Sequence, residues 1–298
     1  MNGAEPVPKP AEPARGRRRS IVFWRRRRDA PLVSVLRLAG IIGRAGPVRT
    51  GSVTLANMER AIDRAFAPRR LAAVALAVNS PGGSPVQSAL IARRIRARAD
   101  ERGVPVLAFA EDVAASGGYW LACAGDEIFA DENSIVGSNA VIAAGFGFVE
   151  AIARHGVERR VHTAGARKGM LDPFRPEDPG EVERLRAVQR DMHESFIAHV
   201  RQRRGRRLKG ADETLFSGEF WSGRQAIALG LVDGLGDLRG VLRDRFGERV
   251  RIRPVAVRRG LRRRLGLGPA GGEIDAGALG AELLAALDEW AMWKRYGL

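Results

Sequence analysis

The chain has 298 residues, 45% of them hydrophobic and 28% charged, which is enough to bury one large core or two small ones. Its 50 lysine and arginine residues against 34 acidic ones give a formal charge of +16, which favours an anionic partner such as nucleic acid or a membrane surface. This composition excludes a collagen-like, disulfide-framed or wholly disordered chain. The single cysteine, Cys123, cannot form an internal disulfide, so a reducing, cytoplasmic compartment is expected.

Residues 1–30 are predicted to be a disordered basic tail, because they carry nine lysines and arginines against three acids. The only apolar piece of this tail, residues 21–24, is too short for a signal peptide. The longest charge-free run, residues 133–149, is interrupted by glycine and asparagine, so no transmembrane helix is expected. Arginines on both sides of residues 21–24 would allow peripheral contact with anionic lipid at the inner face of the cell membrane, although a solvated tail is an equally good interpretation.

From residue 31 to 257 the sequence alternates strand-like and helix-like segments, which predicts a single domain. The repetition of strand, tight turn and helix predicts an α/β fold with a largely parallel sheet covered by helices, and ligands at the carboxyl ends of the strands. The predicted strands are 33–38, 71–78, 104–110, 127–130, 159–163 and 250–257, and the predicted helices are 85–102, a short one ending at 125, 146–154, 177–204 and 221–230.

The C-terminal part of the chain is predicted to be separate from this domain. Residues 258–274 are basic and rich in glycine, which is typical of a linker. Residues 275–298 are predicted to form an amphipathic helix whose leucines and tryptophans dock on another surface of the protein.

Two small-residue turns are candidates for chemistry. Ser116 lies between a predicted strand and helix and is followed by two glycines, so its hydroxyl can be exposed beside free backbone amides. This arrangement is physically similar to a nucleophile elbow, although the G-x-S-x-G spacing is absent. Gly83, in the turn after the second strand, has an unshielded amide that could stabilise an oxyanion. Each turn, taken alone, is equally typical of an ordinary strand–helix connection.

A serine nucleophile needs a base, and lysine is the first candidate. Only four of the 50 basic residues are lysines, and Lys168 lies in a glycine-containing segment after a predicted strand. Unlike arginine, lysine can lose its proton when it is buried, although a solvated loop lysine is the better interpretation on numbers alone. His162 is a second candidate, as part of a Ser-His-Asp triad, and ranks below lysine. There is no HExxH, Cys/His cluster or P-loop, so no metal or other cofactor is expected.

Several motifs together resemble the signal peptide peptidase A family, also called protease IV, over residues 33–246. The motifs occur in the family's order and spacing, which makes them specific together although each is weak alone. They are NSPGG at 79–83, ASGGYW at 115–120, VGS at 136–138, GVERR at 156–160 leading into GARKGMLDPF at 165–174, and WSGRQA at 221–226.

This resemblance implies a ClpP/crotonase-like fold and a serine endopeptidase that cleaves signal-peptide remnants or unfolded segments. It implies that Ser116 is the nucleophile and Lys168 the general base. Ser138 would hydrogen-bond the lysine amine, and the amides of Gly83 and Gly117 would form the oxyanion hole. The family assembles into rings in which a neighbouring subunit supplies the lysine. To act as a base, that lysine needs its pKa lowered from about 10.4 to about 7–8.

The chain departs from the family in two places. No counterpart of the family's N-terminal transmembrane anchor is expected from these residues, and Asn139 follows Ser138 where the family more often has isoleucine. An alternative on the same fold is an acyl-CoA hydratase or isomerase that uses Glu111 and Asp112. A third reading is an inactive basic adaptor on a membrane or nucleic acid, although no nucleic-acid-binding motif is present and no specific nucleic acid is expected as a partner.

Overall fold

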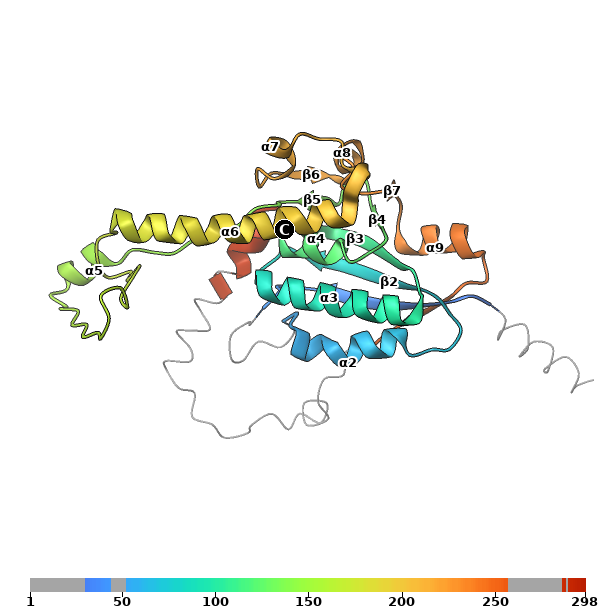
Figure 1. The fold of residues 1–298 in the computed structure, drawn as a ribbon, viewed down its shortest axis with the longest axis horizontal. Coiled ribbons are helices and arrows are strands. Elements are labelled where there is room, and N and C mark those ends of the chain that lie inside the picture. Colours follow the sequence, from blue (N-terminus) through green and yellow to red (C-terminus); the bar gives the residue numbers. More distant parts are fainter. Residues whose placement is uncertain (1–29, 44–51, 257–285, 288) are drawn as a thin grey trace, which may run out of the picture.

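An eight-stranded, largely parallel sheet forms the centre of the computed structural model, which describes residues 30–43, 52–256, 286–287 and 289–298 (Figure 1). The main strand order is β6-β5-β3-β2-β1-β8, and β4 lies between β3 and β7. Only the pairing of β5 with β6 is antiparallel. The strands are β1 Leu32–Ala39, β2 Leu71–Ser80, β3 Val106–Ala115, β4 Glu127–Ala130, β5 Ile135–Gly137, β6 Phe220–Ser222, β7 Gly234–Leu235 and β8 Arg251–Pro254.

Helices cover both faces of this sheet. The larger core packs α2, α3, α4 and the end of α6 against one face, and a smaller core packs α9 against the other. Side chains of β1 point alternately to the two faces of the sheet, so that Leu36 belongs to the larger core and Val33 to the smaller one. The helices are α2 Leu55–Phe66, α3 Pro85–Arg102, α4 Gly117–Ala122, α5 Val149–Arg154, α6 Pro179–Arg204, α7 Asp212–Leu215, α8 Gly223–Ala228 and α9 Leu238–Phe246, with a 3-10 turn at Gly205–Arg207.

β3 has two different neighbours along one of its edges. Its first half pairs with β4, from Leu107 to Ala110, and its last three residues pair with β5. β2 lies along the other edge, with a register irregularity between Val78 and Ser80. The carboxyl end of β3 is therefore held on both edges by parallel neighbours, which fixes where the chain leaves the sheet and turns into α4.

The predicted strands correspond to β1–β4 and β8, except for the one predicted at 159–163, which is wrong. Those residues have no regular structure and are exposed. They lie on an arm, residues 143–178, that extends away from the sheet at the far end of α6 (Figure 1). A strand needs a neighbour for its backbone groups, and none reaches this segment.

Other differences concern elements that the sequence analysis missed or that lie outside the described residues. α2, α7, α9 and β7 were not predicted. β5 was assigned to a loop and most of β6 to the start of the predicted helix 221–230, since three-residue strands have too little alternation to be recognised. The predicted tail, the linker and the first part of the C-terminal helix lie outside the described residues. The described remainder is helical at 286–287 and 289–294. No helix in the described parts of the chain combines the length and apolar character that a bilayer span requires.

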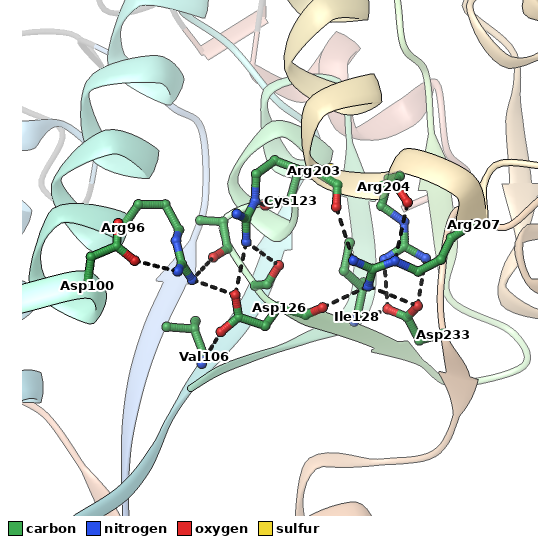
Figure 2. Close-up of polar contacts among 12 residues, drawn as sticks. Arg96, Asp100, Val106, Cys123, Asp126, Ile128, Arg203, Arg204, Arg207 and Asp233 are labelled. Atoms are coloured by element: carbon green, nitrogen blue, oxygen red, sulfur yellow. Dashed lines mark hydrogen bonds and ion pairs between the residues drawn. The ribbon is translucent and has the colours of Figure 1, made fainter. Parts of the chain in front are cut away.

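The carboxyl end of α6 is fixed to the sheet by a group of arginine–aspartate contacts (Figure 2). Arg204, the last residue of α6, has a side chain that is 1% exposed and donates two hydrogen bonds to the Asp233 carboxylate, at 2.7 and 3.0 Å. It also donates to the carbonyl of Gly230, at 2.8 and 3.0 Å. Arg203 and Arg96 both donate to Asp126, at 3.1 and 2.8 Å.

The Asp233 carboxylate is satisfied from several sides. Burial by itself would raise the pKa of Asp233, but hydrogen bonds from Arg204 and from the amide of Ile128, together with the charges of Arg204 and Arg207, lower it below its ordinary value. The buried residues of α6 are Phe196, Val200 and Arg204, and all three lie in its second half. The first half of the helix therefore has no comparable attachment to the sheet. α6 is thus anchored at one end only.

Replacing Asp233 with asparagine should destabilise the fold by about 3 kcal/mol, because it leaves the charge of Arg204 buried without a counter-ion. Urea unfolding followed by circular dichroism measures this loss. Because the folded-state pKa of Asp233 is lowered, the stabilisation should be present at neutral pH and disappear as the pH falls below about 4.

A matched control is Glu132→Gln, which removes a carboxylate from the exposed Arg224–Glu132 pair and should change stability by less than about 1 kcal/mol. Equal unfolding midpoints for the parent and the Asp233 variant would contradict the role given to this contact.

Candidate active site

Ser116 occupies the turn where β3 ends and α4 begins. It has φ 52 and ψ −122, which places a non-glycine residue in a strained backbone region. Its amide donates to the carbonyl of Gly137 at 2.7 Å, and its carbonyl accepts from Trp120 at 3.0 Å. Its side chain makes no capping hydrogen bond to α4. The backbone is therefore held at both sides while the hydroxyl remains available to a ligand.

The turn after β2 packs directly against the turn that carries Ser116. Gly82 has φ +109, and a Cβ placed on it would lie 2.8 Å from the Cβ of Ser116. Gly83 has φ +136, and a Cβ there would lie 2.0 Å from the carbonyl oxygen of Ile42. Both the positive φ and the lack of space require glycine at these two positions. The two turns thus approach each other as closely as their backbones allow.

The amides of Gly83 and Gly117 both lie at this junction. Gly117 is the first residue of α4, so its N–H has no partner within the helix. Neither amide donates to an acceptor among the described residues. Two unpaired backbone donors beside a serine hydroxyl can stabilise an oxygen atom that gains negative charge during acyl transfer.

A cavity of about 520 Å³ opens at this junction, and Ser116, Gly83, Gly117 and Ser138 all line it. Ser138 is buried, has φ 54 and donates its amide to the carbonyl of Glu219 at 2.7 Å. The structure therefore brings together four of the five residues expected from the sequence. The rest of the wall is mainly apolar, with Trp120 and Phe196 among its members.

Lys168, the fifth residue, is not among the residues that line the cavity. It lies on the arm, in an exposed turn where its amide donates to the carbonyl of Gly165 at 3.2 Å. Within one chain, the structure does not bring the amine of Lys168 to the hydroxyl of Ser116. A base for this serine would have to come from elsewhere.

No histidine lines the cavity either. His199 stacks on Trp120, with ring centroids 4.7 Å apart, and its Nε2 lies 3.1 Å from the carbonyl oxygen of Trp120. Burial lowers the pKa of His199 to about 4, so this ring is neutral at physiological pH. His193 is likewise engaged, with its Nε2 3.0 Å from the carbonyl oxygen of Asn139. His162 lies exposed on the arm, so the described part of one chain forms no Ser-His pair at Ser116.

The acidic residues of the acyl-CoA alternative lie in a different cavity, of about 700 Å³. Glu111 forms an ion pair with Arg37 at 2.8 Å, and burial raises its pKa. Asp112 accepts a hydrogen bond from Asn79 at 2.6 Å. Neither side chain lines the cavity of Ser116, so an acid for a hydratase reaction is missing there. Among the described residues, no group of three or more potential metal ligands lies together.

The sequence analysis missed one wall of the cavity. Met292, Arg295 and Tyr296 line it, although residues 275–298 were expected only to dock at an unspecified place. Arg295 and Tyr296 follow Met292 by three and four positions, so the sequence shows that the three residues share one face of a helix. It does not show which surface of the protein that face covers. Asn139, the departure from the family pattern, is buried and donates to the carbonyl of Leu215 at 3.0 Å, so it is part of the packed loop after Ser138.

A serine beside two unpaired backbone amides, on an α/β fold, supplies the nucleophile and the oxyanion donors that acyl transfer uses. Comparison with known proteins agrees, because residues 98–245 match the model of peptidase family S49. The chain is 32% identical over 213 residues to Protease 4 of Haemophilus influenzae, a match that covers 68% of this chain and 32% of that protein. The chain belongs to the signal peptide peptidase A family, and its parallel sheet with helices on both faces confirms the predicted α/β fold.

A second relative is named as a transporter rather than as a peptidase. The chain is 48% identical over 272 residues to a protein of Brucella abortus named Na(+)/H(+) antiporter NhaA, covering 89% of this chain and 37% of that protein. Because the match takes in nearly all of this chain, the shared stretch includes the residues that match family S49. The chain thus spans only about a third of the length of either relative.

Among solved structures, the chain is similar to a membrane-bound stomatin-specific protease in complex with a substrate peptide. The TM-score is 0.49 and the sequence identity 15%, over 80% of this chain and 97% of that one.

Replacing Gly117 with alanine should destabilise the protein by about 1–3 kcal/mol, because the new Cβ would lie 2.5 Å from the Oγ of Ser88. Adding Ser88→Ala should recover part of this loss, since it removes the clashing atom. Gly145→Ala, where nothing lies within 4 Å, is the matched control and should leave stability nearly unchanged. Thermal unfolding of the three variants measures these differences, and a Gly117 variant as stable as the control would contradict the packing described.

Proposed function

We propose that the protein is a serine endopeptidase in which Ser116 is the nucleophile and Lys168 of a neighbouring copy is the general base. The observation that carries this proposal is the strained, half-buried serine that lines a cavity at the junction of two glycine turns, with unpaired amides beside it. Membership of peptidase family S49 supports the same chemistry. The five residues concerned are Ser116, Lys168, Ser138, Gly83 and Gly117.

In this mechanism the Oγ of Ser116 attacks the carbonyl carbon of a peptide bond while the neutral amine of Lys168 takes the hydroxyl proton. The carbonyl oxygen becomes an oxyanion, which accepts hydrogen bonds from the amides of Gly83 and Gly117. The lysine then donates its proton to the leaving amine, and an acyl-enzyme remains. Water, deprotonated by the same lysine, releases the acyl group and restores Ser116.

The base comes from a neighbouring copy because of the geometry of the arm. Lys168 lies on the arm, beyond the unanchored half of α6, and does not line the cavity of its own chain. The same region exposes several large apolar side chains, as expected of a surface covered by another molecule. These are Ile142, Phe146, Phe148, Val157, Val161 and Leu171. In a ring, this surface would be buried and Lys168 would reach the next copy's cavity, where burial lowers a lysine pKa.

Ser138 has a positioning role in the proposed site. Its side chain lies at the cavity on the strand β5 side, and its backbone is held by the carbonyl of Glu219. Its hydroxyl can accept a hydrogen bond from the lysine amine and so keep the amine directed at Ser116. The apolar wall that includes Trp120 and Phe196 favours peptides with apolar or small side chains near the scissile bond, such as signal-peptide remnants or unfolded segments.

Ser116→Ala and Lys168→Ala variants should each lose peptidase activity, and a mixture of the two should regain it. If each site takes its serine and lysine from different copies, random reassembly leaves about a quarter of the sites intact. Hydrolysis of a fluorogenic peptide after joint denaturation and refolding of the two variants measures this.

Lys209→Ala is the matched control, because Lys209 is also exposed and should be dispensable. Full activity of the Ser116 variant would refute the nucleophile. Activity lost in both variants and not regained in the mixed assembly would refute the shared site.

We also propose that the basic N-terminal tail holds the protein at the cytoplasmic face of an anionic membrane. The four consecutive arginines at 25–28 follow a short apolar segment, and each basic residue near such a surface contributes about 1 kcal/mol. The free, buried Cys123 is compatible with a reducing compartment.

Changing Arg25, Arg26, Arg27 and Arg28 to glutamine should weaken binding to vesicles containing phosphatidylserine by about tenfold or more, with little effect on pure phosphatidylcholine vesicles. Co-sedimentation at two salt concentrations measures the difference. Binding that is the same for parent and variant would remove the membrane role of the tail.

A further inference from the structure

The C-terminal segment forms part of the wall around Ser116. Tyr296 is 8% exposed and belongs to a small core with Val113 and Ala115 of β3, against which Trp293 also packs. The ring of Tyr296 meets Phe220 of β6 edge-on, with centroids 5.2 Å apart. Since Ala115 directly precedes Ser116, this docking brings the end of the chain to the site.

The docking of Trp293 and Tyr296 on the sheet determines which side chains of the C-terminal segment face the cavity. Arg295 and Tyr296 follow Met292 by three and four positions, on one side of the C-terminal helix and the turn that ends it, and all three line the cavity. The amide of Arg295 donates to the carbonyl of Ala291 at 3.2 Å, so helical geometry continues to this residue. Arg295 is thus presented to the cavity by a helix that Trp293 and Tyr296 hold in place.

Arg295 is the only charged residue among the described residues that line the cavity. It has no ion-pair or hydrogen-bond partner for its guanidinium among the described residues, whereas Arg94, Arg96 and Arg204, among others, pair with a carboxylate. Guanidinium stays charged at all physiological pH values and binds carboxylates through two parallel hydrogen bonds. Met292 and Phe196 also line the cavity and make its wall mainly apolar.

We propose that Arg295 is a specificity-determining residue, which binds a carboxylate of the substrate near the scissile bond. This inference rests on the proposed peptidase function and narrows its substrate class to peptides that combine apolar side chains with one carboxylate. The carboxylate belongs either to an acidic side chain or to the free C-terminus of the substrate. Because Arg295 is exposed, its contribution is that of a partly solvated ion pair, about three- to fivefold in kcat/KM.

The test uses fluorogenic peptides of apolar sequence in which one position at a time, from three residues before to three after the scissile bond, is glutamate or glutamine. The full-length parent should prefer glutamate at one position, and Arg295→Gln should abolish this preference. Arg295→Glu should reverse it in favour of lysine at the same position. Matched peptides with a free or an amidated C-terminus distinguish the two sources of the carboxylate.

Lys294→Gln is the matched control, because it removes the same charge from the adjacent residue, which does not line the cavity. The preference should persist in this variant. Equal loss in the Arg295 and Lys294 variants would show a general effect of charge and overturn the proposal. Equal rates for all peptides in the parent would also overturn it, while leaving the peptidase function intact.

Binding of the same peptides to the Ser116→Ala variant, measured by fluorescence anisotropy, separates recognition from catalysis. A glutamate preference in binding that Arg295→Gln removes would support the role of Arg295 even if no peptide were hydrolysed, an outcome that would refute the peptidase function alone. Binding without any such preference would refute the role of Arg295.

Discussion

The contact between the turns after β2 and β3 is the constraint on which the site depends. Both strands end at the same edge of a parallel sheet and both turn at once into helices, so their turns must pass within backbone contact of each other. Glycine at position 82 permits that approach, and the sheet on both edges of β3 holds Ser116 in a conformation that costs about 1–3 kcal/mol. The burial of the surrounding strands offsets the free-energy cost of this strained backbone conformation.

A second constraint is the way in which α6 is attached. Arg204 and Asp233 fix its carboxyl end to the sheet, while its 26 residues, about 39 Å in length, extend past the sheet toward the arm. The Arg204–Asp233 ion pair therefore also fixes the orientation of α6, and the arm lies at the opposite end of that helix. Lys168, which lies on this arm, is exposed and away from the cavity of its own chain.

In the proposed mechanism, assembly supplies what the single chain lacks. The cavity already contains the hydroxyl and the two unpaired amides, but no lysine or histidine side chain among the described residues lines it. Enclosure of an amine between two copies would remove water from around it, and desolvation disfavours the charged form of any lysine. The chemistry would then switch on only when copies meet, because the desolvation of the base and its delivery to Ser116 are the same event.

The sequence by itself determined the main strands, the glycine turns and the place of Ser116 in a strand–helix turn, because apolar runs and turn residues are recognised within a few neighbouring positions. It did not reveal β5, β6 or α2, and it wrongly placed a strand at 159–163. Only the tertiary structure decided that the C-terminal helix docks beside Ser116, that His199 is engaged by Trp120, and that Lys168 lies away from the cavity of its own chain. These facts depend on contacts between residues far apart in the chain, which local periodicity does not encode.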